Sequence, residues 1–138
     1  MRMALEGREI QIYGDGSQIR DLVYVDDAVD AFVRAGASDA TNGQVFNVGG
    51  LEPISHSDLV SLLIDVAGAG SIRYVPWPAE KKAIDIGSFF TDSSRFRAAV
   101  GWEPRVPLRD GFAKTLAYYR AHAGAYLDDP APTPSPVA

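Results

Sequence analysis

The chain has 138 residues, of which 46% are hydrophobic, and this length can bury one core. The formal charge of −5, with no run of Lys and Arg, argues against nucleic acid or an anionic membrane as a partner, because phosphate backbones are held by basic patches. With no cysteine and with His56 and His122 far apart in sequence, no disulfide, zinc–thiolate site or other metal site is expected.

The first predicted elements are a short helix and a β-hairpin. Residues 1–6 suit a helix ended by Gly7, and their early charge is unlike a secretory leader, so a cytoplasmic location is expected. Ile10–Tyr13 and Leu22–Val25 have the residue pattern of strands. The turn residues between them predict that the two strands pair as a hairpin.

An apolar helix is predicted next. Asp26 or Asp27 is placed to cap it, because an acidic side chain accepts a hydrogen bond from an unpaired amide at a helix start. The helix reaches about Ala37, and its only polar side chains after the cap are Asp30 and Arg34, one turn apart. Such a helix is expected to be covered on more than one side.

The middle of the chain predicts a buried strand and a well-capped helix. Gln44–Val48 has apolar side chains on both faces, which is typical of a strand inside a larger sheet. Ser55 and Asp58 form a variant of the capping box before a helix with leucines at helical spacing. Gly68 is expected to end that helix.

The remaining elements complete a mixed α+β pattern, and we therefore expect the α/β class. Ile72–Val75 predicts a short strand, Asp92 is expected to cap a further helix, and a last helix is predicted over about Arg109–Ala123. Residues 1–127 are expected to form one unit. Residues 128–138 contain four prolines and predict a disordered tail.

Several short motifs occur in a fixed order along the chain. They are Ile12-Tyr13-Gly14-Asp15-Gly16 followed by Arg20-Asp21 and Tyr24-Val25-x-Asp27; Phe46-Asn47-Val48-Gly49; Ile84-Asp85-Ile86-Gly87 with Asp92 seven residues after Asp85; and Gly101-Trp102-x-Pro104-x-Val106-x-Leu108-x-x-Gly111. With these motifs the chain resembles, over about residues 1–123, the extended short-chain dehydrogenase/reductase family, specifically its NAD-dependent sugar-nucleotide epimerases and dehydratases. The resemblance is to the C-terminal, substrate-binding half of those enzymes.

The resemblance implies that Arg20 reaches the diphosphate of a nucleotide sugar. A planar guanidinium offers two parallel donors to phosphate oxygens, which agrees with that role. The alternative for Arg20 is a surface ion pair with Asp21 or another acid. The strand with Gln11 and Tyr13 is where the family holds the nucleotide base, using backbone groups and an aromatic ring, and for Tyr13 a plain core role is the alternative.

Three further residues are implied to bind the substrate. Asn47 matches an asparagine that contacts the nucleotide sugar in some members, and its alternative role is to hold the turn that follows. Asp85 matches an acid that holds the ribose or an arginine near the phosphates. Lys82 stands where one common form of the pattern has arginine, and Lys81 is an equally good candidate because a lysine acts only as a point charge.

The parts that the family uses for NAD and for proton transfer are not found in this sequence. Gly14-x-Gly16 is followed by Ile19 where a dinucleotide-binding loop has a third glycine, and no tyrosine is followed four residues later by lysine. We therefore expect no catalytic residue and no cofactor bound by this chain alone. NAD is implied for the complete enzyme.

The leading hypothesis is a nucleotide-sugar-binding portion of such an enzyme, for example one like UDP-glucose 4-epimerase. Its partners are then a nucleotide-diphosphate sugar and a Rossmann domain, either N-terminal or on another chain. Apolar surface on the helix around Phe32 and the strand around Phe46 is expected to be exposed and to favour self-association. The alternatives are a non-catalytic binding or interaction module derived from the fold, and an unrelated small α/β domain.

Overall fold

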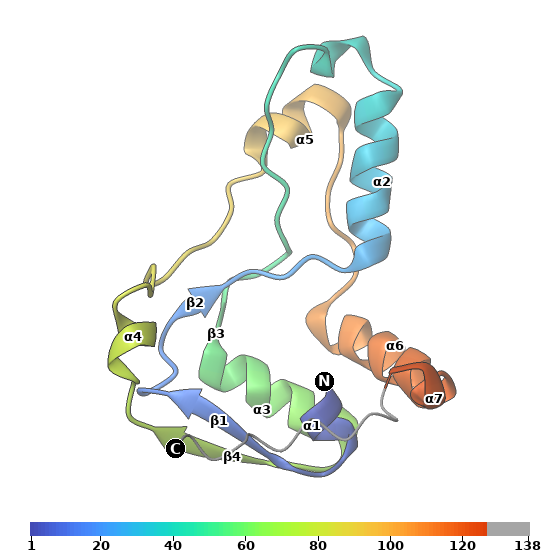
Figure 1. Ribbon diagram of the computed structural model, residues 1–138. Helices are drawn as coiled ribbons and strands as arrows, with labels where there is room; N and C mark the ends of the chain where they lie inside the picture. Colours follow the sequence, from blue (N-terminus) through green and yellow to red (C-terminus); the bar gives the residue numbers. More distant parts are fainter. Residues whose placement is uncertain (127–138) are drawn as a thin grey trace.

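A computed structural model describes residues 1–126 of the chain, so the predicted tail over 128–138 lies outside the described residues (Figure 1). The predicted mixed α/β class is confirmed. None of the helices within residues 1–126 has the length and hydropathy that a membrane-spanning segment requires. The elements are α1 (Arg2–Leu5), β1 (Glu9–Tyr13), β2 (Ile19–Arg20), α2 (Val25–Gly36), the 3₁₀ helix η1 (Asp39–Thr41), β3 (Ile54–Ser55), α3 (His56–Ala67), β4 (Ser71–Val75), α4 (Ala79–Lys82), α5 (Ser94–Val100), α6 (Leu108–Ala121) and α7 (Ala123–Tyr126).

One group of elements is built on a parallel pair of strands. β1 pairs with β4 in the register Glu9↔Ser71 to Tyr13↔Val75, and β2 pairs separately and antiparallel with β3. In Figure 1, α3 and α1 lie beside β1 and β4, and α6 lies next to α3. Their shared core contains the buried side chains of Ala4, Leu63, Phe112 and Leu116.

The second group of elements contains α2, η1 and α5. Its core has only three buried residues, Ala31, Phe96 and Trp102, with partly buried neighbours packed around them. Figure 1 shows this group joined to the first by segments without regular structure. Residues 1–126 therefore form two small hydrophobic clusters in place of the single core expected from the length of the chain.

The helix α3 follows its sequence signals. The Ser55 hydroxyl accepts a hydrogen bond from the amide of Asp58 at 3.0 Å and donates one to the Asp58 carboxylate at 2.6 Å. The helix ends at Gly68, whose φ of 75° favours glycine. The predicted cap, capping-box variant and stop are all confirmed.

The predicted hairpin is wrong. Ile10–Tyr13 does form a strand, but its partner is β4, and Val25 belongs to helix α2. After β1, the Asp15 carboxylate accepts the amide of Ser17 at 3.0 Å and closes a tight turn, so the chain does not return along β1. Local alternation could not distinguish the two pairings, because the true partner lies some 60 residues further along the chain.

The expected cap of α2 is also wrong. Tyr24 is the N-cap residue, and neither acidic side chain caps the helix. Asp27 is buried, and its carboxylate instead accepts the amides of Arg105 at 3.0 Å and Val106 at 2.9 Å. The predicted cap of α5 is corrected by one residue: Ser93 is its N-cap residue, and the Asp92 carboxylate accepts the amide of Ser94 at 2.8 Å.

The predicted strand over 44–48 does not form among the described residues. No strand of residues 1–126 pairs with it, and Val45 is 82% exposed. No hydrogen-bonded turn is assigned at Gly49–Gly50, but the backbone of this segment approaches other segments closely. A Cβ on Gly49 would overlap the Asp21 carboxylate, and one on Gly50 would overlap the Leu22 carbonyl, so both positions require glycine.

Candidate functional site

The candidate site is centred on Arg20, at the end of β2. One nitrogen of its guanidinium, Nη1, donates to the carbonyl of Ile19 at 2.7 Å and to the carbonyl of Gly87 at 2.6 Å. Within residues 1–126 no carboxylate forms an ion pair with Arg20, and Nε and Nη2 have no protein partner. The alternative of a surface ion pair is therefore not realised within residues 1–126. The edge formed by Nε and Nη2 can donate two parallel hydrogen bonds to two oxygens of one anionic group, such as a carboxylate or a phosphate.

The neighbouring Asp21 has a structural role. Its carboxylate accepts the amides of Gly50 at 3.2 Å and Thr91 at 3.3 Å. The Ser93 hydroxyl accepts a hydrogen bond from the amide of Gly49 at 2.9 Å. Asp21 and Ser93 therefore hold the Gly49–Gly50 segment, which was the alternative role considered for the nearby Asn47.

Asp85 lies in the segment that contacts Arg20. Its side chain is only 9% exposed and pairs with Lys82, whose Nζ lies 3.2 Å from Oδ2. Burial raises the pKa of Asp85, but hydrogen bonds from Lys82, the Gly87 amide and Gln18, with the Lys82 charge, lower it overall below the ordinary value. Asp85 is therefore a charged acceptor within this cluster.

The two lysines are already engaged. In addition to its pair with Asp85, Lys82 places its ammonium 5.0 Å from the ring centre of Trp77. Lys81 donates to the Tyr13 hydroxyl at 2.8 Å, and this hydrogen bond raises the Lys81 pKa above its ordinary value. The Lys82 charge also lowers the pKa of Asp15, after the larger effect of hydrogen bonds from Ser17. Both lysines contribute positive charge near Arg20, but each would have to leave a partner to contact a phosphate directly.

Tyr13 lies between charged and aromatic neighbours. Its ring centre is 5.5 Å from that of Trp77, and the Lys81 ammonium is 4.6 Å from its centre. Gly14 follows with a φ of 70°, and a Cβ there would overlap the Trp77 indole. Tyr13 is half-buried, so it combines packing with a polar end at the surface.

The structure brings some predicted site residues together and leaves others apart. Arg20, Lys82 and Asp85 are linked through the segment around Gly87, and Tyr13 joins them through the lysines. Gln11 is exposed on β1, in register with Arg73. Asn47 is exposed and makes no side-chain hydrogen bond within residues 1–126.

Sequence reasoning missed four residues of this cluster. They are Gln18, Trp77, Gly87 and Ser88. Gln18 is 8% exposed, and its side-chain oxygen is buried without a hydrogen-bond partner among the described residues. The prolines on both sides of Trp77 mark a fixed loop, which was a usable signal, and Gly87 is part of the Ile84–Gly87 motif, to which no binding role was given. Nothing local distinguishes Gln18 or Ser88.

The described residues do not fit the phosphate-binding loop that NAD requires. Such a loop joins a strand to a helix whose N-terminus faces the pyrophosphate. Here Gly14 and Gly16 lead from β1 into β2, which is a strand. NAD chemistry is therefore not assigned to any residue within the described part of the chain.

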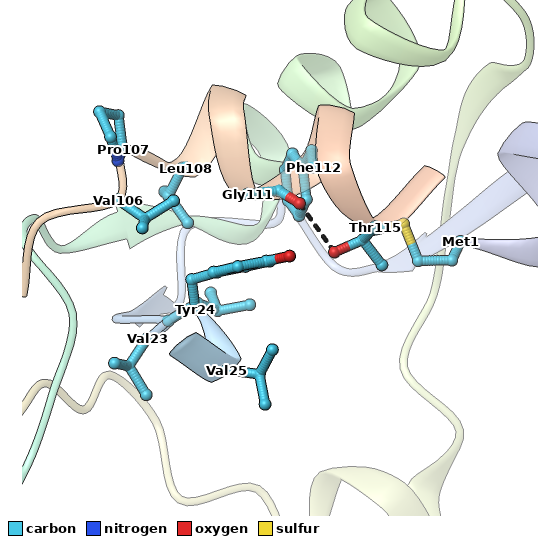
Figure 2. A pocket seen from close by; sticks show the side chains of 11 residues that line it. Met1, Val23, Tyr24, Val25, Val106, Pro107, Leu108, Gly111, Phe112 and Thr115 are labelled. Atoms are coloured by element: carbon cyan, nitrogen blue, oxygen red, sulfur yellow. Dashed lines mark hydrogen bonds between the residues drawn. The ribbon is translucent and has the colours of Figure 1, made fainter. Parts of the chain in front are cut away.

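A separate hollow of about 280 Å³ lies between α6 and the segment before α2. In Figure 2 the Tyr24 ring lies across it, below Gly111 and Phe112 of α6. The lining residues are Met1, Leu22, Val23, Tyr24, Val25, Val106, Pro107, Leu108, Gly111, Phe112 and Thr115. None of these side chains carries a charge, so the hollow does not suit a diphosphate, and the cluster around Arg20 remains the better anion site.

The sequence profile of the NAD dependent epimerase/dehydratase family matches residues 1–49. The UDP-glucose 4-epimerase of Mycolicibacterium smegmatis is 43% identical over 117 residues, covering 84% of this chain. The dTDP-glucose 4,6-dehydratase of Streptomyces griseus is 36% identical over 122 residues, covering 87%. The chain belongs to this family. It spans 36% of the length of each of these two relatives.

Solved structures show the same relationship. A UDP-glucose 4-epimerase from Thermotoga maritima, determined with UDP-glucose, matches 88% of this chain and 38% of its own, with a TM-score of 0.76 and 31% identity. A dTDP-glucose 4,6-dehydratase from Streptomyces venezuelae, with NAD and TYD bound, matches 91% of this chain and 38% of its own, with a TM-score of 0.77 and 27% identity. The resemblance predicted from the motifs is confirmed.

Proposed function

We propose that this chain binds the diphosphate of a nucleotide sugar, as the substrate-binding portion of an NAD-dependent sugar-nucleotide epimerase or dehydratase. The observation that carries the proposal is the hydrogen bonding of the Arg20 guanidinium. Two backbone carbonyls hold one of its nitrogens, and the edge formed by Nε and Nη2 has no partner within residues 1–126. Such an edge donates two parallel hydrogen bonds to one phosphate group.

The surroundings of Arg20 support the same conclusion. Lys81 and Lys82 add positive charge in a chain whose formal charge is −5. Tyr13 and Trp77 offer aromatic surface next to them, which suits the base of a nucleotide. One solved relative was determined with UDP-glucose, which is a nucleotide sugar, and another with NAD and TYD bound.

The test is the affinity for UDP-glucose and dTDP-glucose, measured by calorimetry and by thermal protection. Arg20→Ala is expected to weaken binding by roughly 10- to 100-fold, because a hydrogen bond to a charged group contributes about 1.5–3 kcal/mol. Arg97→Ala is the matched control, since Arg97 is exposed on α5 and pairs with Glu103. Equal affinities in the two variants would rule out the assigned role of Arg20.

The proposal includes a partner that covers α2. Exposed apolar side chains follow one another along this helix: Val25, Val29, Phe32 and Val33. Beside them lies an apolar hollow of about 360 Å³ lined in part by Phe46 and Phe96. Surfaces of this kind are normally covered by another protein surface, and we assign that cover to a dinucleotide-binding domain, N-terminal or on another chain.

A further inference from the structure

The segment Lys82–Phe89, called the strap below, is attached to β2 at several points. The Ser88 hydroxyl accepts the amide of Ile19 at 3.1 Å, and the amide of Phe89 donates to the carbonyl of Ile19 at 3.0 Å. The Gly87 carbonyl accepts from Arg20 at 2.6 Å. The strap therefore lies along the side of β2 that β3 does not occupy.

These contacts determine how the guanidinium of Arg20 is oriented. Both protons of Nη1 are used, one for the carbonyl of Ile19 and one for that of Gly87. Because the guanidinium is planar, fixing both protons of one nitrogen also fixes the direction of the Nε and Nη2 donors. The orientation of the donor edge thus depends on where the Gly87 carbonyl lies.

Gly87 has a backbone conformation that favours glycine. Its φ is 69°, and its amide donates to the Asp85 carboxylate at 3.3 Å. A Cβ at this position would meet no atom within 4 Å, so a substitution there acts through the backbone dihedral and not through a clash. An alanine would drive the strap toward a negative φ, whereas asparagine tolerates the left-handed region.

We propose that Gly87 is a positioning residue through which the strap sets the orientation of the Arg20 donor edge and thereby its affinity for a diphosphate. The inference deepens the proposed function and rests on it for the identity of the ligand. The dependence of the Arg20 orientation on Gly87 is inferred only from the hydrogen bonds of Nη1 with the carbonyls of Ile19 and Gly87. It can be measured without any ligand.

The experiment uses the full chain and three variants, Gly87→Ala, Gly87→Asn and Gly43→Ala. Gly43 is the matched control, because it also has a φ of 69° with no atom within 4 Å of a Cβ and lies in a loop after η1. The first readout is the ¹⁵N relaxation order of the Arg20 Nε–H group without ligand. The second is the affinity for inorganic pyrophosphate and for UDP.

Gly87→Ala is expected to lower the order of the Arg20 group and to weaken pyrophosphate binding roughly tenfold. This is the fold-change that corresponds to the free-energy cost of placing an alanine in the left-handed region. Gly87→Asn and Gly43→Ala are expected to behave like the wild type. If Gly87→Ala leaves the Arg20 group as ordered as before, the inference is overturned. If the wild type binds neither ligand while the order of the Arg20 group still depends on Gly87, the proposed diphosphate binding is wrong. The positioning of Arg20 by Gly87 is supported in that case.

A second variant covers the case in which Gly87→Ala does not fold. Ser88→Ala removes the hydroxyl that accepts the Ile19 amide and leaves the glycine in place. It is also expected to lower the order of the Arg20 group. Unchanged order in this variant would overturn the inference in the same way.

Discussion

The buried carboxylate of Asp27 gives the sharpest prediction about stability. It accepts two backbone amides from the segment after α5, those of Arg105 and Val106, at 3.0 and 2.9 Å. The Asp27 carbonyl also accepts the Trp102 indole at 3.0 Å. Asp27 therefore fastens the first turn of α2 to a segment more than 70 residues away in sequence.

Replacing Asp27 with alanine leaves both amides without their acceptor. Each hydrogen bond to a charged group contributes roughly 1.5–3 kcal/mol, and water replaces part of this, so the expected loss in the free energy of unfolding is about 3 kcal/mol. With a urea m-value of about 2 kcal/mol/M, the unfolding midpoint is expected to fall by about 1.5 M.

The adjacent Asp26 is the matched control. Its side chain is 69% exposed and lies 4.0 Å from the Lys114 ammonium, yet it occupies the same first turn of α2. Asp26→Ala is expected to cost less than about 1 kcal/mol, since it loses only a favourable position near the helix N-terminus and a weak ion pair. Equal midpoints for the two variants in urea denaturation would refute the reasoning. They would mean that Asp27 contributes only what any acidic residue contributes in the first turn of a helix, and that its hydrogen bonds to Arg105 and Val106 add no stability.

Two further predictions concern charge and exposed surface. Asp85 has a folded pKa below the ordinary 3.8, so it stabilises the chain while charged, and the Tm difference between wild type and Asp85→Asn is expected to be constant near neutral pH. That difference should shrink as the pH falls below 3.8, and a constant difference there would contradict it. Phe32 is 79% exposed, so Phe32→Ser is expected to reduce binding of a hydrophobic dye with no loss of Tm, and a large fall in Tm would show that its ring is packed.

Short-range signals predicted the ends of helix α3 correctly. The cap and stop of α3 depend on Ser55, Asp58 and Gly68, which all lie within or next to the helix, and each works as expected. Gly101, which has a φ of 64°, ends α5 in the same way. Local hydrogen bonds and allowed dihedrals decide these features, so a single sequence contains enough information for them.

Features that depend on distant partners were not predictable in this way. The partner of β1 is β4, and the partner of the Asp27 carboxylate is the segment around Arg105. No sequence pattern near β1 or Asp27 indicates either of these distant partners. The strand expected over 44–48 finds no partner strand within residues 1–126. Its apolar pattern indicated burial on both faces, but among the described residues only Phe46 and Val48 pack against a core, and Val45 stays exposed.

The candidate site also has a part that the sequence predicted and a part that only the structure shows. The motif located Arg20 and Asp85, because family resemblance compares residues at fixed positions along the chain. It could not show that the Gly87 carbonyl holds the Arg20 guanidinium, or that the Ser88 hydroxyl holds the neighbouring Ile19 amide, since these partners are 67 and 69 residues apart in sequence. The sequence therefore identified the candidate phosphate ligand, whereas the structure was needed to show what orients it.

The candidate site around Arg20 and the apolar face of α2 are different surfaces, but hydrogen bonds next to Arg20 connect them. The Asp21 carboxylate holds both Gly50 and Thr91, and these residues connect the strap and β3 to the two segments that pack against α2. A protein surface that covers α2 would order those segments, and their hydrogen bonds with Asp21 would carry that order to β2. Binding of a partner to α2 is therefore expected to strengthen the hold on a diphosphate at Arg20, and by linkage the ligand should strengthen partner binding to the same degree.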